Sequence, residues 1–204
     1  MAIADLYDEA LEPNLYYDSH FEIDAVKILP GEYYVTARPM LIVTVLGSCV
    51  AACIRDRVSG IGGMNHFMLP FLSDSGEPIN ASAHHGIYAM EILVNQLLEM
   101  GAQRKNLEAK IFGGGNLLKS FTVANVGERN AVFVRNYLKR EQIPIVAEDL
   151  LDIYPRKIYF FPDQGRVMVK KLLRLHNGTI IQREQEHSRC LQRNEKVAGG
   201  VDLF

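Results

Sequence analysis

The sequence predicts an α/β (α+β) sandwich, a single domain in which mixed β-sheets are layered with two main helices. Short runs of β-branched and apolar residues, separated by turn residues, recur along the chain and predict at least seven strands. Two longer segments, residues 82–100 and 126–141, carry apolar side chains at helical spacing. Because we expect hairpins near both ends and helical crossovers between them, the strand order should be mixed.

Length and composition fit one soluble domain with extensions at both ends. The chain has 204 residues, of which 48% are hydrophobic and 23% charged. We expect an N-terminal extension over residues 1–27, the main domain over 28–173 and a polar C-terminal tail over 174–204. A net charge of −2 gives no electrostatic reason to expect nucleic acid as a partner. The longest apolar stretch falls short of the roughly 20 residues that a membrane helix needs, so we expect no direct membrane insertion.

Residues 41–70 are the most apolar part of the chain, and they also contain a cysteine and a histidine. Residues 41–46 predict a buried strand that is interrupted at Gly47 and Ser48. A hairpin should follow, with strands at residues 49–56 and 61–69. Further strands are predicted at residues 31–37, 107–112, 143–147, 157–161 and 166–172, the last two joined by a Pro-Asp-Gln-Gly turn.

The hairpin's loop length decides whether Cys49 and His66 lie on the same face of the sheet. With a two-residue loop, Cys49 faces His66 directly. With the four-residue loop 57–60, Cys49 faces Met68 and His66 is its diagonal neighbour on the same face. Loops of three or five residues would place the two side chains on opposite faces. The sequence therefore permits a Cys–His pair and leaves the register open.

A thiol next to an imidazole has a specific chemical use. The imidazole can take the thiol proton, which makes Cys49 a candidate nucleophile and His66 its candidate base. Gly47 and Ser48 precede the cysteine, and their backbone N–H groups could hold an oxyanion beside the sulfur. The alternative is structural, because free cysteines are commonly buried and inert and a histidine on an apolar strand can be a core residue.

Other groups offer weaker alternatives. His84 or His85 could serve as the base, but adjacent helical residues do not face the same way. The glycines at 113–115 follow a strand and could cradle phosphate, although they fit no nucleotide-binding motif; close backbone packing beside the site is the better interpretation. The sparse cysteines are typical of a cytoplasmic protein. Cys49 and Cys53, about 13 Å apart on one strand, predict neither a disulfide nor a metal site.

The motifs TVLGSCV (residues 44–50) and GGMNHFMLP (62–70) resemble the chemoreceptor glutamine deamidase (CheD) family. Later blocks are similar as well: KIFGG, VGERN, IPI and GRVMVKK follow in the family's order, so the resemblance spans residues 28–173. It implies layered sheets with helices outside them, Cys49 as the nucleophile, His66 as its base and Thr44 as a third site residue. It also implies hydrolysis of glutamine side-chain amides in chemotaxis receptors, without a cofactor.

Two departures from the family pattern concern local geometry. Thr44 stands only five residues before the cysteine, whereas some members have a longer run between them. Residues 149–155 read DLLDIYP where many members have a Gly-Gly pair. These departures put the orientation of Thr44 and the shape of the later loop in question.

The resemblance also implies partners. These are the cytoplasmic helices of chemoreceptors and, further, a CheC-type phosphatase. Two other functions stay open: another cysteine amidohydrolase, or a non-catalytic chemotaxis adaptor. For the C-terminal tail, residues 180–187 predict a short helix with a thin apolar face. The tail is then either disordered or a peptide that docks onto a partner or onto its own domain.

Overall fold

The computed structural model describes residues 13–69, 79–116 and 126–173, and in the C-terminal tail residues 179–180, 182–187 and 189–190. The described chain forms two mixed five-stranded sheets. The first has the order β1-β2-β4-β9-β10, formed by Asn14–Asp18, Ile23–Lys27, Leu41–Leu46, Arg156–Phe161 and Arg166–Lys171. The second has the order β3-β6-β5-β7-β8, formed by Tyr33–Thr36, Gly62–Asn65, Val50–Asp56, Leu107–Gly113 and Ile145–Leu150.

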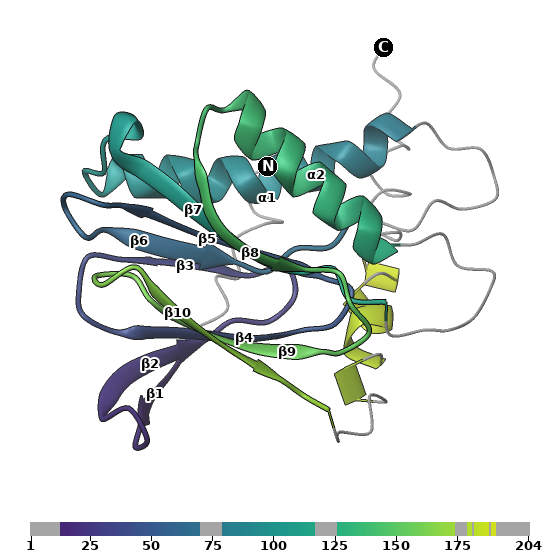
Figure 1. The fold of residues 1–204 in the computed structure, drawn as a ribbon, viewed down its shortest axis with the longest axis horizontal. Coiled ribbons are helices and arrows are strands. Elements are labelled where there is room, and N and C mark those ends of the chain that lie inside the picture. Colours follow the sequence, from purple (N-terminus) through teal and green to yellow (C-terminus); the bar gives the residue numbers. More distant parts are fainter. Residues whose placement is uncertain are drawn as a thin grey trace, which may run out of the picture.

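The elements stack in three layers (Figure 1). Helices α1 (Ile79–Glu99) and α2 (Val126–Arg140) cover one face of the second sheet, and the first sheet lies against its other face. A short 3-10 helix, Arg104–Asn106, precedes β7. The fold class predicted from the sequence, an α+β sandwich of mixed sheets with two main helices, is therefore confirmed.

The side chains of β5 point alternately toward the helices and toward the first sheet. Val50, Ala52 and Ile54 pack with the helices, whereas Ala51 and Cys53 pack with the first sheet. Both faces of this strand are buried because neighbouring side chains on a strand point to opposite faces. The strand is therefore apolar from Val50 to Ile54.

The predicted helices are confirmed with small shifts at their ends. The helix predicted from residue 82 begins at Ile79, and α2 ends one residue earlier than predicted. Gly101 follows α1 with φ of +103°, and its N–H donates to the carbonyl of Leu98 at 2.9 Å. A glycine reaches this left-handed conformation without strain, which ends the helix as expected.

The strands differ from the sequence prediction in two places. Residues 14–27, inside the predicted N-terminal extension, supply β1 and β2 to the first sheet. The strand predicted at residues 143–147 runs instead over Ile145–Leu150, because β7 and β8 pair in parallel as far as Leu150. The domain boundaries at residues 27/28 and 173/174 stay predictions. Three other features that the sequence predicts lie outside the described residues: residues 71–78 of a loop expected at 71–81, an apparent lysine–serine pair at Lys119 and Ser120, and Asn125 as the cap of the second helix.

Within the described part of the chain, none of the helices has the length and apolar character needed to cross a membrane.

Candidate active site

The register of the hairpin places Cys49 and His66 on the same face. Asp56 pairs with Ile61 across the four-residue loop 57–60, and Val50 pairs with Phe67 through two hydrogen bonds of 2.9 Å. This register aligns Cys49 with Met68, so His66 is the diagonal neighbour of Cys49. Of the loop lengths that the sequence left open, the four-residue loop is the one found, and both residues face the first sheet.

Thr44 meets His66 between the two sheets. In β4, Ile42 and Leu46 pack against the second sheet, and Thr44 shares their face because it lies at even spacing between them. Thr44 Oγ1 lies 2.8 Å from His66 Nδ1 and 2.8 Å from the carbonyl oxygen of Ile28. The short spacing before the cysteine therefore leaves Thr44 on the inner face, in contact with the imidazole.

The two contacts of Thr44 fix the tautomer of His66. A hydroxyl has one proton, and the carbonyl of Ile28 can only accept, so Thr44 donates to Ile28. Thr44 must then accept from His66, which places the imidazole proton on Nδ1. The remaining lone pair is on Nε2, a buried atom with no hydrogen-bond partner among the described residues. His66 is thus a neutral imidazole whose basic nitrogen is unused.

Burial keeps His66 neutral. The side chain is 2% exposed, and burial, with a smaller effect from the charge of His187, lowers the pKa of His66 to about 3. Its backbone is also fixed, because its N–H donates to the carbonyl of Glu32 and its carbonyl accepts from the N–H of Gly31. The imidazole therefore has little freedom to turn.

Gly47, Ser48 and Cys49 form a loop in which the chain crosses from β4 in one sheet to β5 in the other. All three carbonyl groups are bound from the side of the second sheet and α2. The carbonyl of Gly47 accepts from Gly115 N–H, that of Ser48 from Asn130 Nδ2 and that of Cys49 from Gly114 N–H, at 2.7–2.8 Å. With the carbonyls held there, the N–H groups of the loop are free to bind one ligand.

The glycines after β7 make this arrangement possible. An added Cβ on Gly113 would lie 2.1 Å from the carbonyl oxygen of Cys49, and one on Gly115 would lie 2.9 Å from that of Gly47. Gly113 also has φ of +113°. Only residues without a side chain allow such an approach, so the interpretation of residues 113–115 as close backbone packing is confirmed.

Glu184 from the C-terminal tail binds the N–H groups of the loop. Its Oε1 accepts from Gly47 and Cys49 N–H at 3.0 and 3.1 Å. Its Oε2 accepts from Ser48 N–H at 3.0 Å and from Ser48 Oγ at 2.7 Å. Glu184 is 8% exposed, so its carboxylate has lost most of its contact with water. Four hydrogen bonds from the loop replace that hydration, as a buried ionised group requires.

The thiol of Cys49 lies beneath this carboxylate and is fully buried. Burial, the negative charge of Glu184 and hydrogen bonding to it all raise the pKa of the Cys49 thiol well above its usual range. In this arrangement the thiol is protonated and the imidazole of His66 is neutral. His66 Nε2 makes no hydrogen bond to the thiol in this arrangement, and the ionised Cys–His pair stays a prediction.

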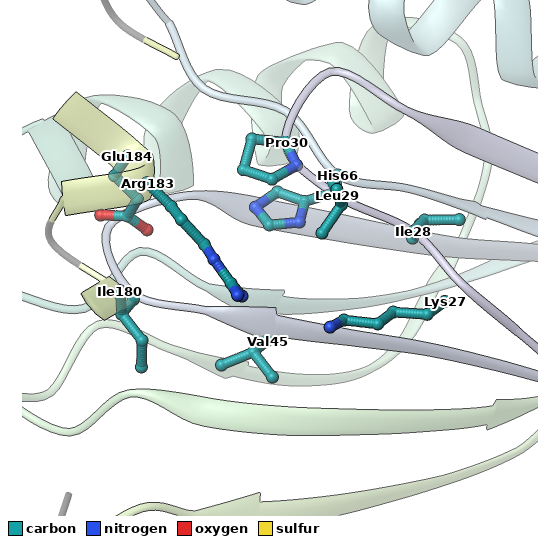
Figure 2. A pocket seen from close by; sticks show the side chains of 9 residues that line it. All are labelled: Lys27, Ile28, Leu29, Pro30, Val45, His66, Ile180, Arg183 and Glu184. Carbon is teal, nitrogen blue, oxygen red and sulfur yellow. The ribbon is translucent and has the colours of Figure 1, made fainter. Parts of the chain in front are cut away.

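A small pocket reaches His66 from the side of the C-terminal tail (Figure 2). Its walls come from three parts of the chain: the Lys27–Pro30 turn, Val45 of β4, and the tail. Figure 2 shows Arg183 extending from the tail between Val45 and His66, with the carboxylate of Glu184 at its edge. The tail thus forms one wall of the route to the imidazole.

Two contributors to the site escaped prediction from the sequence. The sequence predicts for Asn130 only a place on a helix, yet its buried amide donates to the Ser48 carbonyl and accepts from Leu69 N–H at 2.9 Å. Its signal was an asparagine on the inward face of a predicted amphipathic helix. For Glu184 the sequence predicts only a place in a polar tail. Its signal was the spacing Ile180, Glu184 and His187, which places three side chains on one helical face.

The alternative base candidates lie on α1. The structure describes no side chain for His84, and the charge of His85 acts on His187 of the tail. The described residues contain no cluster of three or more His, Cys, Asp or Glu side chains that could hold a metal ion.

Comparison with known proteins assigns the family. The family model described as "CheD chemotactic sensory transduction" matches residues 68–171. A relative from Thiobacillus denitrificans, named probable chemoreceptor glutamine deamidase CheD, is 65% identical over 198 residues, which cover 97% of this chain and 98% of the relative. The chain belongs to the CheD family. A second CheD relative of the same name, from Methylobacillus flagellatus, is 61% identical over 204 residues and covers 99% of this chain and 100% of its own.

The CheD family model begins after the cysteine and histidine, whereas the matches to the CheD relatives extend over nearly the whole chain and so span positions 49 and 66. Among solved structures, hypothetical protein YfiH from Bacillus licheniformis matches with a TM-score of 0.41 at 15% identity, covering 68% of this chain and 60% of its own.

Proposed function

We propose that the protein is a chemoreceptor glutamine deamidase, an enzyme that hydrolyses glutamine side-chain amides of chemotaxis receptors to glutamate and ammonia. The relatives that are 61–65% identical over nearly the whole chain carry this name. The observation that supports the chemistry is the loop at residues 47–49, whose N–H groups bind a glutamate carboxylate directly above a cysteine. That carboxylate is the group which deamidation of glutamine produces.

In the proposed first step, His66 Nε2 takes the thiol proton and the Cys49 sulfur attacks the amide carbon of the substrate. A C–S bond forms and the carbonyl π electrons move onto oxygen. Gly47 and Cys49 N–H, which now hold Glu184 Oε1, stabilise this oxyanion. Thr44 accepts from His66 Nδ1–H and keeps the imidazole in the tautomer that can act as a base.

The remaining steps return the enzyme to its starting state. His66 gives its proton to the leaving nitrogen, the C–N bond breaks and ammonia departs, which leaves a thioester on Cys49. His66 then takes a proton from water, hydroxide attacks the thioester carbon, and the thiolate leaves and recovers a proton. The net reaction consumes one water and converts the amide to a carboxylate and ammonium. The chain's own residues supply every group for these steps.

The test is mass spectrometry of a receptor cytoplasmic fragment incubated with the protein. We expect specific glutamines to gain the mass of glutamate, with ammonia release and without chain cleavage. Cys49→Ala and His66→Ala should abolish the conversion. Cys53→Ala is the matched control, because Cys53 is another buried cysteine at the same sheet interface.

The outcomes separate the alternatives. Cleavage of the fragment would indicate a peptidase, and ammonia release from other amides alone would indicate a different amidohydrolase. A protein whose chemotaxis phenotype survives Cys49→Ala would be an adaptor. On the proposed function it acts in the cytoplasm on receptor helices, and binding to a CheC-type phosphatase is a separate measurement by pull-down with purified protein.

A further inference from the structure

The tail binds the loop in an oriented way. Both Gly47 N–H and Cys49 N–H converge on one oxygen of Glu184, and Ser48 contacts the other oxygen with its N–H and its hydroxyl. Every N–H of the loop is therefore used by one side chain that lies 135 or more residues away in the sequence.

Two further contacts position the tail. Residues 182–187 are helical, and Ile180, Glu184 and His187 are less exposed than the described residues between them. Ile180 lines the pocket beside Val45, as Figure 2 shows. His187 lies against Gly31, where an added Cβ would come within 2.8 Å of its ring. The spacing of four and three residues places all three side chains on one helical face.

The bound group matches the product better than the substrate. Ser48 N–H donates to Glu184 Oε2, and an amide nitrogen in that place would present another donor. A carboxylate accepts from all the donors of the loop and carries a full negative charge among them. The group that fits this loop at rest is thus the side chain of glutamate.

Resting on the proposed function, we propose that the C-terminal helical segment is a product-like internal ligand of the active site, which a substrate must displace before Cys49 can react. Glu184 covers the thiol, which is 0% exposed, and occupies the N–H groups that the oxyanion requires. Its charge also raises the pKa of Cys49, which disfavours the thiolate.

A competing explanation is that Glu184 takes part in catalysis by holding the loop in shape. The carbonyl contacts argue against it, because Gly114, Gly115 and Asn130 already hold the loop from the other side. The two explanations predict opposite effects of removing the carboxylate. A merely structural Glu184 lowers kcat when it is removed, whereas an internal ligand lowers the apparent KM and leaves kcat unchanged.

The first experiment measures the thiol and needs no substrate. The full-length protein is treated with iodoacetamide, and labelling of each cysteine is followed by peptide mass spectrometry. In Glu184→Ala we expect Cys49 to react faster by about tenfold or more, because the thiol is uncovered and loses the neighbouring negative charge that disfavours the thiolate. Glu186→Ala is the matched control: it removes the same charge from an exposed position of the same segment and should label at the wild-type rate.

The other cysteines serve as internal standards. Cys190 is exposed and should react equally in all variants, and Cys53 is buried between the sheets and should stay unreactive. If Glu184→Ala also made Cys53 reactive, its fold would have opened, and Glu184→Met, which keeps the length of the side chain but has no carboxylate, would replace it with the same expectation. Labelling of Cys49 at the wild-type rate in a folded variant overturns the proposal.

The second experiment compares wild type, Glu184→Ala and Glu186→Ala on a receptor cytoplasmic fragment. A lower KM at unchanged kcat in Glu184→Ala alone supports the internal ligand, and a lower kcat overturns it. The two experiments separate the failures. Faster labelling of Cys49 with no deamidation by any variant would refute the proposed function and leave the covering of the thiol intact. If wild type deamidates the fragment but Cys49 labels at the same rate in Glu184→Ala, the internal-ligand proposal is refuted and the proposed function stands.

Discussion

Replacing Thr44 with valine tests how the imidazole is held. Valine keeps the shape of threonine and removes the hydroxyl that contacts both His66 Nδ1 and the Ile28 carbonyl. All three groups are buried, so water cannot replace the hydroxyl. A buried polar group left without a partner costs about 1–3 kcal/mol, so the two groups together should lower the free energy of unfolding by about 2–6 kcal/mol.

The same change should slow catalysis. General acid–base catalysis contributes roughly 10²–10⁴-fold, and it requires the base nitrogen to be unprotonated and correctly aimed. Without an acceptor at Nδ1, His66 can take the other tautomer or turn, so we expect kcat to fall by about 10- to 100-fold. Thr44→Ser is the matched control. It keeps the hydroxyl and loses one buried methyl, which should cost about 1 kcal/mol of stability and little activity.

The assay measures glutamine deamidation in a receptor fragment by mass spectrometry. It is run at a temperature at which urea denaturation curves show that every variant is folded. Nitrogen NMR of His66 reports the tautomer directly, with the proton expected on Nδ1 in wild type. A folded Thr44→Val variant with wild-type kcat would refute the reasoning, as would a wild-type imidazole protonated on Nε2.

Three further predictions concern the loop, the tail and the pH. Glu184→Gln places an amide above Cys49, and we expect the introduced glutamine to convert slowly back to glutamate with first-order kinetics. The conversion should be absent when Cys49→Ala is added, and the exposed Gln182 and Gln185 should stay unchanged in the same peptide spectra. Asn130→Ala removes two buried hydrogen bonds and should destabilise the protein by about 2–4 kcal/mol in urea denaturation, whereas the exposed Val132→Ala should have little effect. The pKa of His66 lies near 3 in the folded protein and near 6.5 in its ordinary state, so the unfolded chain binds the extra proton between these values. Stability should therefore fall as the pH drops below 6.5, by at most about 1.4 kcal/mol per pH unit from this residue, and His66→Gln should remove that part of the slope in denaturation curves between pH 6.5 and 5.

Local patterns in the sequence were sufficient for most of the fold. The strand Leu41–Leu46 agrees with its predicted bounds, and the hairpin has one of the registers that parity allowed. The sequence alone left the choice among these registers open, because both faces of β5 are buried and apolar, so the hydrophobic pattern is similar after a slip by one residue. The resemblance to the family then indicated which cysteine and histidine to examine.

What local patterns could not predict is where distant segments meet. The interruption at Gly47 and Ser48 was evident, but nothing in it specified that β4 and β5 belong to different sheets. Glu184 illustrates the same limit. A glutamate in a polar helix ordinarily faces solvent, and burial becomes favourable only because the loop supplies four donors. That compensation is a property of the folded loop and has no counterpart in the tail's own sequence.

The segment DLLDIYP shows a third kind of limit. Leu151 and Asp152 both have positive φ, at 69° and 74°. Glycines adopt such angles without strain, so the Gly-Gly pair that the resemblance to the family leads us to expect here would suit this turn. Here the buried guanidinium of Arg156 donates to the carbonyls of Asp149 and Leu151 and holds the turn. Side chains that are unusual for a turn are thus kept in place by a residue outside it.

Thr44 belongs to one sheet and His66 to the other, and this affects how activity is lost when the protein is destabilised. The hydroxyl that orients the imidazole belongs to a different layer from the imidazole itself, and the ladder bonds within each layer do not depend on the layer opposite. A small sliding of one layer over the other would part the imidazole from its hydroxyl and still leave every strand paired. We therefore expect gentle heating or mild denaturant to abolish the activity while the far-UV circular dichroism spectrum stays that of the native protein.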